Sequence, residues 1–373
     1  MKKISFKKIV FAATVISLLI LTNFSLLFAE GRLTGETSLI NSLKFTKNSW
    51  TYAAGGSAEL SYTSVGNANV KSEVTLQFRF PSPAIALDDG EPSSAVVIPL
   101  VSVKSASIKA RFPSFRLTVG KTRVSWGDGF FFNAGDLIYG STETDGIDLT
   151  TNELRTETAW LTAVQIPLGR FSFAEALVLP PAPDGRSNAD GAAGVRFYTT
   201  LNSVKVEGGY LFAKNRRLYT ALQGNIGPDW YGAAAVDLPG SSSTEDPLNL
   251  LQDSLSFSFG LFHLQKLNRI QSVTLRLEGL VRPWSSWSAQ TTEHDYGIYL
   301  YPEISYTPAD AVSISLRSLV SPVDLSAQIT SGISWNILQG FTLMGYLTVN
   351  AGESSDIFAW EAVDLSLGVN YIY

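Results

Sequence analysis

DLSLGVNYIY, residues 364–373, ends the chain and decides the fold. Counting back from the last residue, every second side chain is apolar, and most of those between are small or polar. The apolar set is Val363, Leu365, Leu367, Val369, Tyr371 and Tyr373. A period of two predicts a β-strand with one apolar face. Because an apolar edge strand in water promotes aggregation, we expect this strand to be paired at its edge and its apolar face to be shielded from water.

The same period of two dominates the chain from residue 36 onward. In SVTLRLEGLV (272–281), apolar residues alternate with Thr274, Arg276 and Glu278. Most such segments approach the roughly 9–11 residues with which a tilted strand crosses a bilayer. We expect eighteen strands, at 36–43, 57–65, 70–80, 104–112, 115–124, 157–166, 170–178, 193–201, 204–212, 218–225, 230–237, 254–265, 271–281, 296–306, 312–319, 325–336, 341–349 and 362–373. Merging the weak segments near 36–43 or 218–237 would give sixteen.

The composition separates this chain from a helical membrane protein. Of its 373 residues, 45% are hydrophobic and only 16% are charged. Beyond the N-terminal region, no apolar run approaches the roughly eighteen residues that a membrane helix needs. Apolar residues that are spread out and alternate are typical of an all-β transmembrane barrel built of antiparallel, up-and-down strands.

The N-terminus predicts export. A basic start and an apolar stretch from Ile9 to Leu21 precede a cleavage position after Ala29, which is the pattern of a signal peptide over 1–29. The alternative is an uncleaved inner-membrane anchor, because apolar residues continue to Phe28. After cleavage, residues 30–373 form the barrel, and loss of four lysines changes the net charge from −5 to −9. An acidic exported chain gives no reason to expect nucleic-acid binding.

The connectors between the expected strands are sorted by length. Reading back from the C-terminus, every second connector is a tight turn rich in Gly, Pro, Asn or Asp: 338–340, 307–310, 266–269, 226–229, 201–203, 167–169, 113–114 and 66–69. The alternate connectors are mostly longer: 81–103, 125–156, 179–192, 238–253, 282–295 and 350–361, with short exceptions at 213–217 and 320–324. Tight turns at one rim and long loops at the other are typical of an outer-membrane barrel.

The chain end resembles that of the outer-membrane β-barrels of diderm bacteria, which commonly finish on a strand of alternating apolar residues with a terminal aromatic. Leu367, Val369, Tyr371 and Tyr373 match this ending. The resemblance implies that these residues form an assembly signal read by the barrel-assembly machinery. It also implies that the last strand pairs with the first, so that no edge remains and the apolar face contacts outer-membrane lipid.

The longest connector contains the most unusual sequence. RVSWGDGFFFNAGD (123–136) is similar to an Arg–x–x–Trp–Gly–x–Gly…Asn–x–x–Asp stretch of uncharacterised outer-membrane barrel families. We expect loop 125–156 to fold into the barrel mouth, with Trp126 and the phenylalanines packed on the wall and Arg123 paired with Asp128 or Asp136. The constriction candidates are Arg123, Trp126, Asp128, Phe131 and Asp136. The alternative is a loop that lies outside on the surface.

If the apolar faces contact lipid, the charged faces of the strands line the lumen. The expected lumen charges are Arg79, Lys109, Arg111, Arg116, Arg196, Arg276, Glu278 and Arg317. Basic residues outnumber acidic ones on these faces, which favours a weak preference for anions. The alternative is that these charges pair with one another across the wall and stabilise it.

Catalytic and metal sites are not expected. The chain has no cysteine and only two histidines, His263 and His294, neither in a context that suggests a nucleophile–base arrangement. The acids of the longest loop have no EF-hand spacing. We therefore expect no enzyme, no metal and no cofactor.

An eighteen-strand barrel is too wide for its own side chains to fill, and it leaves an aqueous channel unless something plugs it. The sequence therefore predicts an outer-membrane, porin-like channel for passive diffusion of small hydrophilic solutes, narrowed by loop 125–156 and able to form oligomers. The alternative is a structural barrel that binds partners through its long extracellular loops.

Overall fold

The computed structural model describes residues 31–46, 49–64, 68–80, 85–86, 100–142, 144, 147–150, 154–181, 191–239, 254–289, 294–360 and 362–373. The predicted signal peptide, 1–29, lies outside these residues. Among the described residues, no helix has the length and apolar character to span a bilayer.

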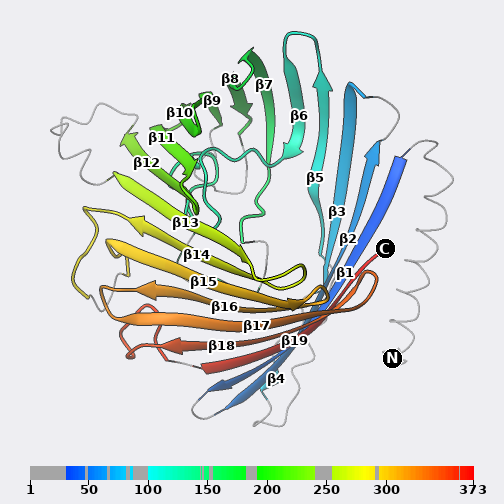
Figure 1. Ribbon diagram of the computed structural model, residues 1–373, viewed down its shortest axis with the longest axis vertical. Coiled ribbons are helices and arrows are strands. Elements are labelled where there is room, and N and C mark those ends of the chain that lie inside the picture. The colour runs from blue at the N-terminus through cyan, green and yellow to red at the C-terminus, as the bar shows by residue number, and fades with distance from the viewer. Residues whose placement is uncertain are drawn as a thin grey trace, which may run out of the picture.

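The described chain is a closed, antiparallel, all-β barrel of eighteen strands (Figure 1). The short β4 (Ile85–Ala86) adds to the end of β2. The barrel strands are β1 (Gly31–Thr46), β2 (Trp50–Ser64), β3 (Val70–Phe80), β5 (Leu100–Arg111), β6 (Arg116–Thr122), β7 (Ala159–Gly169), β8 (Ser172–Leu179), β9 (Ala192–Leu201), β10 (Val204–Phe212), β11 (Asn215–Asn225), β12 (Asp229–Pro239), β13 (Ser256–Lys266), β14 (Ser272–Val281), β15 (Ile298–Ala309), β16 (Val312–Ser321), β17 (Ser326–Leu338), β18 (Phe341–Ala351) and β19 (Ala362–Ile372). Each of the eighteen predicted segments overlaps one of these strands, so the alternative of sixteen is wrong.

The last strand closes the barrel. β19 pairs with β18 on one side and with β1 on the other, and the β1 register runs from Glu36↔Ile372 to Thr46↔Ala362. The terminal Tyr373 exchanges two backbone hydrogen bonds of 2.9 Å with Gly35. Both edges of the C-terminal strand are therefore hydrogen-bonded to neighbouring strands, as its sequence predicts.

Both ends of the barrel domain lie at the rim that carries the tight turns. One of these turns, between β17 and β18, requires glycine at position 340. Gly340 has a φ of +79°, and its carbonyl accepts a 2.8 Å hydrogen bond from the Ile372 amide of the neighbouring strand. Glycine adopts this backbone conformation at little cost, whereas other residues resist it.

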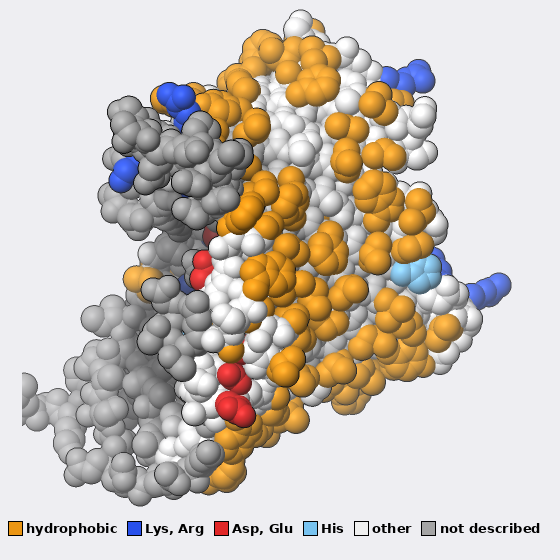
Figure 2. All heavy atoms as spheres, turned by 90° about the vertical axis from the view of Figure 1, so that its left-hand side faces the viewer, with side chains coloured by type: hydrophobic (Ala, Val, Ile, Leu, Met, Phe, Trp, Pro, Cys, Tyr) orange, Lys and Arg blue, Asp and Glu red, His pale blue; other side chains and the backbone are white. Residues whose placement is uncertain are grey.

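The two faces of the wall differ in polarity. Leucines such as Leu275 and Leu277 on β14 point outward and are about half exposed, whereas Glu278 on the same strand points inward and is 1% exposed. Figure 2 shows hydrophobic side chains covering one side of the barrel, with charged side chains at its edges. An apolar outer face around a polar interior is the arrangement of a barrel that stands in lipid.

The buried apolar side chains lie inside the barrel, between the wall and the long β6–β7 connection, in two clusters. One lies against β7–β12 and includes Trp126, Leu177, Leu211 and Tyr219. The other lies against β14–β16 and includes Phe131, Phe132, Leu149 and Tyr301.

Candidate functional site

The β6–β7 connection, residues 123–158 and hereafter the internal loop, lies inside the ring of strands (Figure 1). The described residues of this loop (123–142, 144, 147–150 and 154–158) form no strand, yet Trp126, Phe131 and Phe132 are 0% exposed. The sequence predicts this inward fold and the packing of Trp126 and the phenylalanines on the wall. Because a buried loop must satisfy its backbone polar groups, its hydrogen-bond partners identify what holds it there.

The first anchor is a pair of wall carboxylates. Glu175 on β8 accepts a 2.9 Å hydrogen bond from Trp126 Nε1, and Glu207 on β10 accepts one of 2.9 Å from the Gly127 amide. Arg196, on the intervening strand β9, forms ion pairs with Glu175 at 3.0 Å and with Glu207 at 3.1 Å. The guanidinium compensates for burying both carboxylates, which would otherwise be costly.

The second anchor is Glu278 on β14. Its carboxylate accepts hydrogen bonds from three successive loop amides: Phe130 at 3.2 Å, Phe131 at 2.8 Å and Phe132 at 2.9 Å. Phe131 stacks on Tyr301 of β15 with ring centroids 4.3 Å apart. Charge-assisted hydrogen bonds to backbone amides are strong, so this one carboxylate fixes residues 130–132 of the loop against β14.

The unusual motif builds the bend between the two anchors. Gly127 and Gly129 have φ values of +69° and +153°, which other residues rarely adopt. The fully buried Asn133 donates a 2.9 Å hydrogen bond from Nδ2 to the Trp126 carbonyl and closes the bend. The glycines and the asparagine of the motif therefore shape the loop, and Trp126 fastens it.

Asp136 ends the motif in a buried ion-pair network. It contacts Arg155 and lies 3.6 Å from Arg123, which also pairs with Glu157 at 2.9 Å. Of the two partners that the sequence offers for Arg123, the structure selects Asp136. Burial raises the pKa of Asp128 above its ordinary value, and the charged groups that also affect this pKa are Lys205, Glu207 and Arg196.

A passage remains between the internal loop and the wall of β1–β3 and β5. Two adjoining cavities of about 670 Å³ and 790 Å³ occupy it. These strands contribute Glu36, Glu59, Arg79 and Lys104, and the adjoining β19 contributes Asn370. The loop contributes Arg123, Phe130, Asp148, Arg155 and Glu157. Lys104 on β5 and Glu59 on β2 form an ion pair at 2.8 Å that reaches across the intervening strand β3. The passage is therefore polar and carries both signs of charge.

Solved structures share this architecture. OccAB1 of Acinetobacter baumannii is 10% identical over 93% of this chain and 97% of that chain, with a TM-score of 0.57. OccK2 (OpdF) of Pseudomonas aeruginosa is 11% identical over 92% and 98%, also with a TM-score of 0.57. OccAB4 of A. baumannii is 11% identical over 93% and 99%, with a TM-score of 0.55. The fold of this chain, a closed antiparallel barrel, is the fold of these structures. The sequence matches no protein-family profile and no curated protein.

In this barrel, three of the basic residues predicted to face the lumen form ion pairs with carboxylates of the wall. Arg196 joins the first anchor, and Arg276 and Arg317 both pair with Glu303 on β15, at 2.7 Å and 3.2 Å. Arg276 also lies 3.6 Å above the Phe130 ring. For these three arginines, the alternative that lumen charges pair with one another and stabilise the wall is therefore the correct one.

The other basic residues face open space. Lys109, Arg111 and Arg116 line a cavity of about 430 Å³ towards the tight-turn rim, together with Lys71. Arg79 lines the main passage. Within the part of the chain that the structure describes, none of these five groups forms an ion pair within 4.0 Å.

Sequence reasoning missed two residues of the loop support. Glu175 is an acid at an inward position between apolar neighbours of β8, which is a usable signal for a buried partner. Arg155 stands in a polar stretch of the loop, and no sequence pattern distinguishes it from a solvated arginine.

Proposed function

We propose that this protein is an outer-membrane channel through which small hydrophilic solutes diffuse passively. The observation that carries the proposal is the polar passage between the internal loop and the β1–β5 wall of a closed eighteen-strand barrel. A barrel of this width has room for water, and the loop occupies only one side of its lumen.

The internal loop sets the width of the channel. Trp126, Phe131 and Asp136 are buried, so their role is to hold the loop rather than to contact solutes. The loop residues that face the passage include Arg123, Phe130 and Glu157. Of the predicted constriction residues, Arg123 is the one that lines these two cavities.

A weak preference for anions follows from the lumen charges. The paired arginines contribute little net field, whereas Arg79, Lys109, Arg111 and Arg116 face open cavities. Rings of basic side chains in a pore favour anions. In planar bilayers under a salt gradient, the reversal potential reports this preference, and a cation-selective value would contradict it.

Conductance tests the proposal itself. Purified protein inserted into planar lipid bilayers is expected to give discrete current steps, and liposomes that contain it are expected to admit small sugars and amino acids. Folded protein that inserts but passes neither ions nor solutes would overturn the proposal.

Two interactions of the barrel complete the proposal. We assign Leu367, Val369, Tyr371 and Tyr373 on or next to β19 as the signal for the barrel-assembly machinery, because these side chains form the outward face of the closing strand. The apolar outer face also permits contact between copies of the barrel in the membrane.

A further inference from the structure

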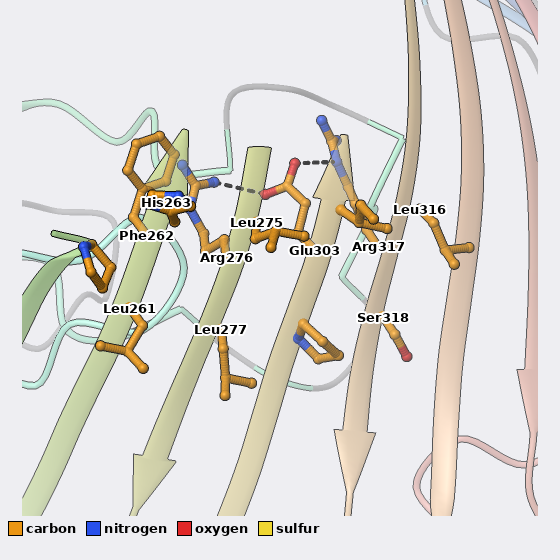
Figure 3. Close-up of a pocket in the computed structure, with 13 residues that line it drawn as sticks. Leu261, Phe262, His263, Leu275, Arg276, Leu277, Glu303, Leu316, Arg317 and Ser318 are labelled. Atoms are coloured by element: carbon orange, nitrogen blue, oxygen red, sulfur yellow. Dashed lines mark hydrogen bonds and ion pairs between the residues drawn. The ribbon is translucent and has the colours of Figure 1, made fainter. Parts of the chain in front are cut away.

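The lipid-facing surface has a hollow on β13–β16. Its volume is about 520 Å³, and its outward lining is apolar: Leu261, Leu275, Leu277, Pro302, Ile304 and Leu316. Figure 3 shows these leucines on one side of the sheet, while Arg276, Glu303 and Arg317 form their ion pairs on the other. A cavity of roughly 300–1,000 Å³ is large enough to seat a ligand of drug size, and an acyl chain is comparable.

Pro302 explains why the surface is hollowed at this point. Its compact ring occupies an outward position opposite Leu277 in the middle of the wall. Proline has no amide hydrogen, and within the described strands the β15–β16 ladder skips from Leu300↔Val320 to Glu303↔Arg317. Because Pro302 is smaller than the surrounding leucines and cannot donate a hydrogen bond to the next strand, it leaves a gap in the outer surface.

The hollow lies in the half of the barrel nearest the tight turns. Leu275 is the fourth residue of β14 counted from the turn, and Pro228, in the β11–β12 turn, also contributes to the lining. The tight-turn rim of such barrels faces the periplasm, so the hollow lies at the depth of the inner leaflet.

The rim beside the hollow carries charges of both signs. The β13–β14 turn presents the exposed Lys266 and Arg269, and His263 lies between this turn and the hollow. The turns on either side each carry an exposed acid, Asp229 and Asp310. A headgroup with a phosphate and an ammonium complements this pattern better than a purely anionic one.

We propose that this hollow binds one phospholipid of the inner leaflet, with an acyl chain along the leucines and Pro302 and a zwitterionic, ethanolamine-type headgroup at the β13–β14 turn. The phosphate lies near Lys266 and Arg269, and the ammonium lies near Asp229 or Asp310. The site depends on the barrel standing in a membrane and not on whether the channel conducts.

The test is native mass spectrometry of the barrel released from micelles that contain phosphatidylethanolamine. Ser318→Leu fills the hollow, where Ser318 is part of the lining. Ser331→Leu is its matched control, because Ser331 lies opposite Leu316 on β17, points to lipid and is outside the hollow. Arg269→Glu removes the phosphate contact, and Arg170→Glu makes the same change at the distant β7–β8 turn.

The wild type and both controls are expected to retain one bound phosphatidylethanolamine. Ser318→Leu is expected to lower the bound fraction roughly fivefold, because its side chain occupies the position of the acyl chain. Arg269→Glu is expected to lower the bound fraction at least fivefold, because losing one basic residue at a membrane surface has about this effect and the new carboxylate also repels the phosphate. Phosphatidylglycerol is expected to be retained less than phosphatidylethanolamine. Equal retention in all five proteins would overturn the proposal. So would an oligomer that Ser318→Leu dissociates, since the hollow would then seat a second copy of the barrel.

Discussion

Glu278 shows how much a single side chain controls in this molecule. It is buried, and three loop amides converge on its carboxylate. We expect Glu278→Ala to lower the free energy of unfolding by about 3 kcal/mol, because three buried amides lose their acceptor. The freed loop tip would also change the single-channel conductance and increase its noise.

Chemical unfolding in detergent and single-channel recording measure these two effects. Thr274→Ala is the matched control, because Thr274 lies inward on the same strand, nearer the tight turns. If both variants change stability equally, Glu278 is not the anchor.

The ionisation of Asp128 makes the stability of the barrel and the charge of its lumen depend on pH. Burial raises its pKa, with opposing contributions from Lys205 and Arg196 and a reinforcing one from Glu207. The folded state therefore binds this proton more readily than the unfolded chain, and ionisation of Asp128 costs stability as pH rises through the raised pKa. As pH falls, Asp128 becomes neutral before an ordinary aspartate does, so the lumen becomes more positive.

Reversal potentials measured between pH 7 and about pH 4 would show anion selectivity rising at a higher pH in the wild type than in Asp128→Asn. Asp128→Asn should already be the more anion-selective at neutral pH. Identical profiles for the two proteins would show that Asp128 does not affect permeating ions.

At the scale of elements, the internal loop and the wall are separable. The wall strands satisfy one another in a closed ladder, whereas the loop depends on the wall. We expect a barrel in which a Gly-Ser linker replaces residues 127–154 to fold and to conduct more than the wild type. Glu207→Gln and Glu278→Gln should accompany the deletion, because both carboxylates would lose loop donors.

Circular dichroism checks that the shortened protein retains its β-structure, and single-channel recording measures the gain in conductance. A shortened barrel that folds and conducts no better than the wild type would show that the loop does not limit the pore.

The strands could be predicted from sequence, but the contacts between the loop and its anchors could not. Alternation reports which face each residue occupies, and turn residues report where strands end, so all eighteen elements follow from local patterns. On β14, however, Thr274, Arg276 and Glu278 share one inward face and one pattern. Only the fold brings Phe131 to Glu278 across 147 positions of sequence. The two-residue β4 was missed because so short a pairing leaves no periodic signal.

At the scale of the whole molecule, the closing seam between β1 and β19 is the decisive contact. The outward Tyr373 ends this seam, and its backbone is already held by Gly35. We expect Tyr373→Ala to fold into detergent with nearly wild-type stability and to insert more slowly in proteoliposomes that contain the barrel-assembly machinery. The adjacent Ile372→Ala is the matched control. Equal slowing of both variants, or slow folding in detergent, would assign Tyr373 to stability instead of recognition.

The closed barrel was predictable for a physical reason. A chain whose apolar residues alternate, with tight turns at one rim, can satisfy its backbone in lipid only by closing on itself. The position of the open passage was not predictable, because it depends on which side of the lumen the loop occupies. That choice rests on the carboxylates of β8, β10 and β14 and leaves the β1–β5 side open.

The placement of the loop against β7–β16 has a geometric consequence. The passage lies off the barrel axis. The straight strands of the β1–β5 wall form one side of it, and the irregular backbone of the internal loop forms the other. In the proposed channel, the narrowest dimension of a solute therefore limits its permeation. We expect flat or rod-shaped solutes to permeate faster than bulky solutes of equal mass.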